Sequence, residues 1–118
     1  MSRLSPDKRM LEYALNDACS DIFAFSTTRH GGISTDTYAS LNCTPYTGDS
    51  AENVLRNQKL LLEALPQRPQ ELVIPWQTHG TASLVIDTDY LQADPQTRHE
   101  RLQGIDALIT REPSVCLC

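Results

Sequence analysis

Residues 72–87 read Leu-Val-Ile-Pro-Trp-Gln-Thr-His-Gly-Thr-Ala-Ser-Leu-Val-Ile-Asp, two short apolar runs separated by a polar loop. The runs Leu72–Pro75 and Ala82–Asp87 are rich in β-branched residues, which predicts two strands. The loop between them carries His79 followed by Gly80. A histidine on a loop between two rigid elements is well placed for a functional role.

Further strands are predicted on both sides of this unit. Ile22–Thr28 and Ile105–Thr110 have strand composition, and Ser114–Cys118 is expected to pair with the latter through a Glu112–Pro113 turn. Leu11–Leu15 is expected to form an edge strand. The polar residues 1–9 are expected to be mobile.

One helix is predicted over Ser50–Leu65. Asp49 and Glu52 have the spacing of a capping box. Apolar residues recur at helical spacing and give a broad apolar face, and Pro66 ends the helix. The members of that face are Val54, Leu55, Leu61, Leu62 and Leu65.

Residues 33–49 contain many turn-forming residues, which predicts a long structured loop with a short extended piece at Ser40–Cys43.

A second helix is indicated by the helical potential of the residues after Pro95. The fold class expected from these elements is α+β, with a mixed β-sheet core and flanking helices in a layered α/β/β/α arrangement. Residues 1–118 are expected to be the N-terminal part of a single domain, truncated within a core strand, because Ser114–Cys118 lacks a following turn, charge or cap.

The 118-residue chain has a formal net charge of −5 and a pI of about 5.0. An acidic chain without a basic stripe argues against nucleic-acid binding and against attraction to an anionic membrane. The N-terminal residues lack the apolar run of a signal peptide, and no segment approaches the roughly 20 apolar residues needed to span a bilayer. We therefore expect a cytoplasmic protein.

The four cysteines are Cys19, Cys43, Cys116 and Cys118. The chain is not dense in cysteine and has no secretory context, so free, buried thiols are favoured over disulfides. Cys116 and Cys118 lie two apart in a predicted strand and are interpreted as structural thiols rather than metal ligands.

His79 is a candidate metal ligand, because a neutral imidazole suits zinc and Gly80 lets the backbone turn away behind it. Gln77 and Thr78 could support the ring through hydrogen bonds. Local sequence chemistry alone favours the alternative, a surface-loop histidine with ordinary hydrogen bonds. A single histidine offers no ligand spacing to test.

Arg29 ends a predicted strand and precedes Gly31-Gly32, which suggests a guanidinium and free N–H groups facing an anion. A β-turn with a solvated arginine is the slightly favoured alternative. Ser40 and Asn42 could orient a ribose or a phosphate, and a polar loop that satisfies its own backbone is at least as good an interpretation. His30 and His99 are interpreted as ordinary polar residues.

Taken together, several segments in order resemble one family. They are Phe25–Ser34, Tyr38–Asn42, Gly48-Asp49 with Val54 and Asn57, Pro75–Gly80, Val85–Asp87 and Asp106–Thr110. The chain resembles the laccase-domain family, also called peptidoglycan-editing factors and formerly multicopper polyphenol oxidases. The resemblance implies a cytosolic enzyme that cleaves purine nucleosides (adenosine, inosine, methylthioadenosine) with phosphate. It also implies adenosine deamination as a second activity and a link to peptidoglycan precursors.

The resemblance further implies a zinc site in which His79 is the first ligand. The family's other ligands, a cysteine and a second histidine, lie in segments after the strand that matches Val115–Cys118, so Cys116 and Cys118 do not replace them. The remainder of its own domain after Cys118 is thus an expected partner, and the isolated chain is expected to be inactive. The expected substrate contacts are Arg29, Ser40, Asn42 and Gln77, with Arg29 the candidate for phosphate.

Alternative functions remain open from the sequence. One is a cysteine-nucleophile hydrolase acting on peptidoglycan precursors, whose nucleophile would also follow Cys118. Another is a non-catalytic interaction domain. Copper, the older family assignment, has less support than zinc, because one histidine without a Cys-His-Met set is a poor copper site.

Overall fold

The computed structural model describes residues 2–118, which divide into two compact units, one that ends at Leu65 and one from Pro66 to Cys118. Both units combine helices with small sheets, so the predicted mixture of helices and strands is confirmed. Within these described residues, no helix is long and apolar enough to cross a membrane.

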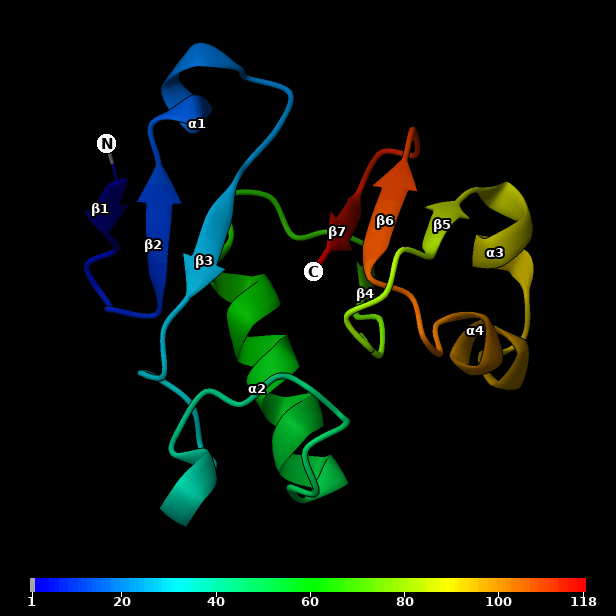
Figure 1. The fold of residues 1–118 in the computed structure, drawn as a ribbon. Coiled ribbons are helices and arrows are strands. Elements are labelled where there is room, and N and C mark those ends of the chain that lie inside the picture. The colour runs from blue at the N-terminus through cyan, green and yellow to red at the C-terminus, as the bar shows by residue number, and fades with distance from the viewer. Residues whose placement is uncertain (1) are drawn as a thin grey trace. The chain divides into compact units, whose positions relative to one another are not determined.

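The first unit contains an antiparallel sheet, a long helix and an extended loop. The sheet has the order β1-β2-β3, and its strands lie side by side in Figure 1. The elements are β1 (Ser2–Leu4), β2 (Met10–Tyr13), α1 (Leu15–Ala18), β3 (Phe25–Thr27), a 3-10 helix at Asp36–Tyr38, and α2 (Ala51–Ala64).

Two expectations about the N-terminal segments were wrong. The predicted edge strand corresponds to β2, which is the central strand, and the residues expected to be mobile include β1. All three residues of β1 are exposed, and Arg3 forms an ion pair with Glu12 of β2. Backbone pairing rather than apolar burial therefore holds β1, and such pairing leaves no hydrophobic pattern in the sequence.

Helix α2 matches its predicted position within one residue at each end, but its cap differs. Ser50 is the N-cap, and its side chain accepts a hydrogen bond from the Asn53 amide at 3.4 Å. Asp49 instead accepts a hydrogen bond from the Ser34 hydroxyl at 2.6 Å, which removes it from the capping position. The apolar face is also narrower than expected, because Leu55 is 65% exposed.

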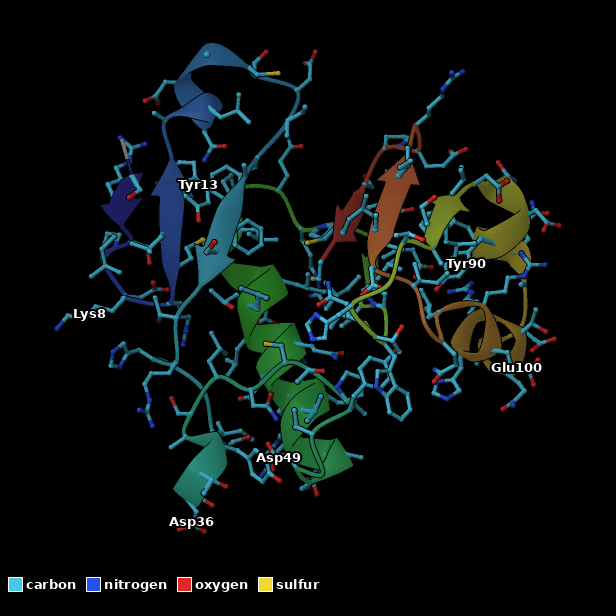
Figure 2. All side chains as sticks on the ribbon, viewed as in Figure 1. Lys8, Tyr13, Asp36, Asp49, Tyr90 and Glu100 are labelled. Carbon is cyan, nitrogen blue, oxygen red and sulfur yellow. The ribbon has the colours of Figure 1, made fainter. Side chains whose placement is uncertain are left out.

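The buried face of α2 includes a polar residue that holds the long loop. Asn57 is 0% exposed, and its Oδ1 accepts a hydrogen bond from the Ile33 amide at 2.9 Å. Its Nδ2 donates to the Ser34 hydroxyl and to the Asn42 carbonyl, each at 2.9 Å. Loop 33–49 is thus fastened to the helix by side-chain amide bonds, and Figure 2 shows Asp49 where this loop enters α2.

Gly32 permits a close approach between two backbone segments of the same loop. A Cβ atom at this position would lie 2.1 Å from the Ser40 carbonyl oxygen and 2.4 Å from the Leu41 Cα. Both are backbone atoms, so neither can rotate away as a flexible side chain would.

We expect Gly32→Ala to destabilise the protein by roughly 1–3 kcal/mol, the usual range for overpacking. The control is Gly80→Ala, where the nearest atom to a new Cβ is a carboxylate oxygen of Asp106 at an ordinary 3.4 Å. Urea denaturation should show a clear fall in midpoint for the first variant and a much smaller change for the second. Equal midpoints would contradict the close approach.

The second unit contains two parallel strand pairs and two short helices. Its elements are β4 (Glu71–Val73), β5 (Ser83–Ile86), α3 (Thr88–Gln92), α4 (Pro95–Arg101), β6 (Ala107–Thr110) and β7 (Val115–Leu117). Strand β5 pairs with β6, and β4 pairs with β7. The helix expected after Pro95 is confirmed as α4, which Asp94 caps by accepting from the Thr97 amide at 2.8 Å.

The predicted hairpin between β6 and β7 was wrong, because β7 pairs with β4 instead. Ser114 adopts a φ of +60°, and its carbonyl accepts from the amides of Gln70 at 2.8 Å and Glu71 at 3.2 Å. The chain therefore leaves the turn already bound to the start of β4, and the strand continues along it.

The core of the second unit lies between its strands and helices. Val73, Ile86, Tyr90 and Leu102 form one buried cluster, and Figure 2 labels Tyr90, which belongs to α3. Partly buried residues packed against it include Leu117 of β7. This cluster joins both strand pairs, which fixes the loops that leave their ends.

All four cysteines are free thiols, as expected, but they are not fully buried. Cys118 is exposed and the other three are half-buried. A hydrogen bond with Cys118 lowers the pKa of Cys116 and outweighs the opposing effect of burial. This contact arises because side chains two apart in a strand share one face.

Candidate functional site

His79 lies on the turn that connects β4 to β5, and a single carboxylate holds that turn. Asp106 Oδ1 accepts hydrogen bonds from the backbone amides of Thr78 at 3.0 Å and His79 at 2.8 Å. Its Oδ2 accepts from the Gly80 amide at 2.7 Å. Consecutive N–H groups that converge on one point form an anion-binding nest, which here is filled from within the chain.

The backbone on both sides of the turn is tied to the segment that carries Asp106. Before the turn, Trp76 exchanges hydrogen bonds with Leu102 at 3.0 Å and Gly104 at 2.9 Å. After it, the Asp106 amide donates to the Ala82 carbonyl at 3.0 Å, one residue before the β5–β6 ladder begins. The carboxylate is therefore placed by the sheet, and not by a flexible loop.

His79 itself carries the left-handed backbone conformation of the turn, with a φ of +59°. The sequence pattern assigned the change of direction to Gly80, whose φ is not in the left-handed region. Left-handed backbone is unfavourable for residues with a Cβ, and it persists where surrounding contacts determine it. The Asp106 contacts supply that determination, and the imidazole is left on an exposed residue.

The Asp106 carboxyl stays ionised at neutral pH. Desolvation raises its pKa, but the hydrogen bonds from Gly80, His79 and Thr78 outweigh it, so the net effect is a pKa below the usual value. An ionised carboxylate accepts from all three amides, which a protonated acid could not do as well.

A pocket of about 450 Å³ in the first unit brings together three of the predicted substrate contacts. It is lined by Arg29, Thr37, Tyr38, Ala39, Ser40, Leu41, Asn42 and Thr47. Arg29 is exposed, and its Nε donates to the Ala39 carbonyl at 3.0 Å, which anchors the guanidinium at the pocket wall. The pocket has a cationic residue and several hydroxyl groups, the groups that phosphate and sugar hydroxyls bind.

The side chains of Ser40 and Asn42 also hold the pocket loop. The Ser40 hydroxyl donates to the Arg29 carbonyl at 2.8 Å and accepts from the Gly32 amide at 3.1 Å. Asn42 Nδ2 donates to the Thr47 hydroxyl at 2.9 Å and to Asp49 at 3.2 Å. The hydrogen bond from Ser34 to Asp49 is the largest influence that lowers the pKa of Asp49. These bonds shape the pocket wall from within the loop.

The remaining candidate residues do not line the Arg29 pocket. Gln77 is exposed on the His79 turn, whereas His30 and His99 are exposed on other segments. Burial raises the pKa of the Cys43 thiol to about 11, which keeps it protonated and unsuited to act as a nucleophile at neutral pH.

His79 is the metal ligand that the sequence predicts in this chain. Residues 2–118 contain no group of three His, Cys, Asp or Glu side chains arranged to hold a metal ion. Zinc sites in proteins use three or four protein ligands. His79 fits the role of one such ligand, since its imidazole is exposed and its backbone is fixed.

Sequence reasoning assigned no role to Asp106 or Asn57. Asp106 follows Gly104-Ile105, directly precedes a strand and begins one of the segments that carry the family resemblance, but none of these signals pointed to a contact with the His79 turn. Asn57 lies three residues after Val54 and four before Leu61, on the apolar stripe of the helix. An amide in that stripe indicates a buried polar contact.

Comparisons with known proteins agree with the family indicated by the motifs. The chain is 57% identical to a purine nucleoside phosphorylase of Bacteroides thetaiotaomicron over 118 residues, all of this chain and 44% of the relative. It is 38% identical to adenosine deaminase RL5 of an unknown prokaryotic organism over 75% of this chain and 34% of that protein. A purine nucleoside phosphorylase of Haemophilus influenzae is 44% identical over 63% of this chain and 31% of its own length.

The chain thus spans less than half the length of these relatives. No solved structure gives a significant match. The model of the multi-copper polyphenol oxidoreductase laccase family matches residues 23–118, which include the His79 turn, Asp106 and the Arg29 pocket. The chain therefore belongs to the multi-copper polyphenol oxidoreductase laccase family.

Proposed function

We propose that the protein containing this chain is a zinc-dependent purine nucleoside phosphorylase that acts on adenosine, inosine and methylthioadenosine. The observation that carries the proposal is the 57% identity, over the whole of this chain, to a protein named as a purine nucleoside phosphorylase. Because the chain spans 44% of that relative, residues 1–118 would be the N-terminal part of one catalytic domain, completed by the remainder of that domain.

His79 is the residue of this chain that would hold zinc. Zinc needs further protein ligands, which the proposal places outside residues 2–118. When bound, zinc with an open position polarises a substrate atom or lowers the pKa of a bound water. The fixed turn around His79 presents one imidazole for this purpose, and Gln77 beside it is available to contact substrate.

Arg29 is the residue that would bind phosphate. Phosphorolysis joins a phosphate oxygen to the anomeric carbon of ribose and breaks the bond from that carbon to the purine nitrogen, whose electron pair then takes a proton. The Arg29 Nε is held by the Ala39 carbonyl, so its Nη groups remain as the donors for an anion. Ser40 and Asn42 at the same pocket would orient the anion or the sugar hydroxyls.

Adenosine deamination is a second proposed activity, supported by the 38% identity to a protein named as an adenosine deaminase. The two reactions give different products from adenosine. Phosphorolysis releases adenine and requires phosphate, whereas deamination gives inosine without it.

We expect metal removal to slow phosphorolysis by the full-length protein strongly. Treatment with a strong chelator should reduce the phosphate-dependent release of adenine by roughly a hundredfold, because a Lewis acid contributes several kcal/mol of charge stabilisation. Chromatographic product analysis measures this rate, and added zinc should restore it. The control is alkylation of the zinc-loaded protein with iodoacetamide, which should leave most of the activity.

The same experiment separates the proposal from its main alternative. Activity that survives chelation but disappears on alkylation would identify a cysteine-nucleophile hydrolase. Phosphate-independent conversion of adenosine to inosine alone would restrict the protein to deamination.

A further inference from the structure

The contacts around the His79 turn suggest a role for a residue outside the expected ligand set. Asp106 lies 27 positions after His79 in the sequence, yet its carboxylate accepts from the amide of His79 and from the amides on both sides of it. The bonds, at 2.7–3.0 Å, involve both carboxylate oxygens, which fixes the plane of the carboxylate as well as its position.

The three hydrogen bonds to Asp106 depend on the left-handed conformation of His79. With a φ of +59°, the amides of Thr78, His79 and Gly80 point to a common centre, an arrangement that an extended histidine could not provide. The Cα–Cβ direction of His79 follows from the same backbone conformation. The contacts that fix the turn therefore also fix the direction in which the imidazole leaves the backbone.

The sheet supports Asp106 rather than the reverse. The Asp106 amide donates to Ala82, and the next residue, Ala107, begins the β6 ladder opposite Ser83 of β5. On the other side of the turn, Trp76 is bonded to Leu102 and Gly104. Backbone hydrogen bonds already fix the segments on both sides of the turn. Because the Asp106 carboxylate links the turn to these segments, it holds the turn as rigidly as the sheet is held.

We propose that Asp106 is a positioning residue that holds His79 in its left-handed conformation and thereby aims its imidazole at the zinc ion. The proposal rests on the function proposed above for His79. Asp106 acts through the backbone of the ligand and does not itself touch the metal. Residues that orient metal ligands typically change metal affinity by 10–100-fold when removed, roughly the range expected here.

The test compares Asp106→Ala with Asp94→Ala in the full-length protein. Asp94 is a matched control, because its carboxylate also accepts backbone and side-chain bonds, from Thr97, at the start of α4 in the same unit. We expect Asp106→Ala to weaken zinc binding by about tenfold or more in competition with a chromophoric chelator. It should also alter the visible spectrum of the cobalt-substituted protein. Asp94→Ala should leave the zinc affinity and the cobalt spectrum unchanged, while its thermal midpoint should be similar to that of Asp106→Ala.

A graded variant adds a second measurement. In Asp106→Asn the side-chain oxygen can still accept from Thr78 and His79, but its amide group meets the Gly80 amide as a second donor. We expect zinc affinity between those of the wild type and Asp106→Ala. Wild-type affinity and an unchanged cobalt spectrum in both Asp106 variants would overturn the proposal.

Amide hydrogen exchange keeps this inference separable from the zinc assignment. In the metal-free protein, the amides of residues 78–80 should exchange slowly in the wild type and in Asp94→Ala, and much faster in Asp106→Ala. Equal exchange rates in all three proteins would overturn the positioning role directly. If the wild type and His79→Ala bind zinc equally, the proposed zinc function fails, and positioning at a zinc ion fails with it. Slow exchange that depends on Asp106 would then show that the turn is held for another purpose.

Discussion

His79→Ala in the full-length protein should remove bound zinc and reduce phosphorolysis by about a hundredfold or more, since loss of a direct ligand exceeds the 10–100-fold effect of outer contacts. Zinc content after dialysis and the phosphate-dependent release of adenine measure the two effects. The reason is that a zinc site with three protein ligands loses one of them, and the remaining pair binds too weakly to keep the ion. Retained zinc with normal turnover would reject His79 as a ligand.

Two further variants show whether this loss reflects chemistry or folding. His79→Gly also removes the imidazole, but glycine adopts a φ of +59° without the roughly 1–2 kcal/mol cost that other residues incur. We expect His79→Gly to lose zinc and activity, and its thermal midpoint without metal should equal or exceed that of the metal-free wild type. His99 is an exposed residue of α4, so His99→Ala should change neither the zinc content nor the activity. Loss of zinc in His99→Ala as well would point to a general effect on the fold.

Asn57→Ala should lower the free energy of unfolding by about 3–5 kcal/mol, a large effect for one substitution. The side chain is 0% exposed and makes hydrogen bonds with Ile33, Ser34 and Asn42. Its removal leaves the Ile33 amide and the Asn42 carbonyl without this partner and opens a cavity in the same place. Urea denaturation measures the change.

The controls for Asn57 separate the hydrogen bonds from the volume. Asn57→Leu keeps the volume but not the bonds, so it should be nearly as destabilising as the alanine variant. Lys59→Ala lies on the same helix and is exposed, so it should stay within about 0.5 kcal/mol of the wild type. A loss below about 1 kcal/mol in both Asn57 variants would mean that the loop does not depend on this residue.

The loop fastened by Asn57 also carries the Arg29 pocket. Ser40 and Asn42 lie within it, and Asn42 is bound directly by the Asn57 side chain. The stability of α2 and the shape of the pocket are therefore coupled through one buried amide. The sequence placed Asn57 in the helix, but it could not reveal this link, because the partners lie 15–24 positions away.

Elements with a strong local pattern could be predicted from the sequence. Helix α2 was located by apolar spacing and by Pro66, and strands β5 and β6 by their β-branched residues. Both signals arise from neighbouring residues in the chain. Strand β1 and the partner of β7 could not be predicted, because their positions depend on backbone pairing with distant segments.

By itself, the sequence determined the α2 helix and the main strands, and it indicated the His79 turn as the candidate functional site. These features could be predicted because periodicity and turn residues act over a few positions of the chain. Only the tertiary structure decided what that turn is: a left-handed histidine, and not the glycine after it, held by a carboxylate from the entrance of β6. The physical reason is that the hydrogen bonds of Asp106 join residues that become neighbours only when β5 and β6 align in parallel register.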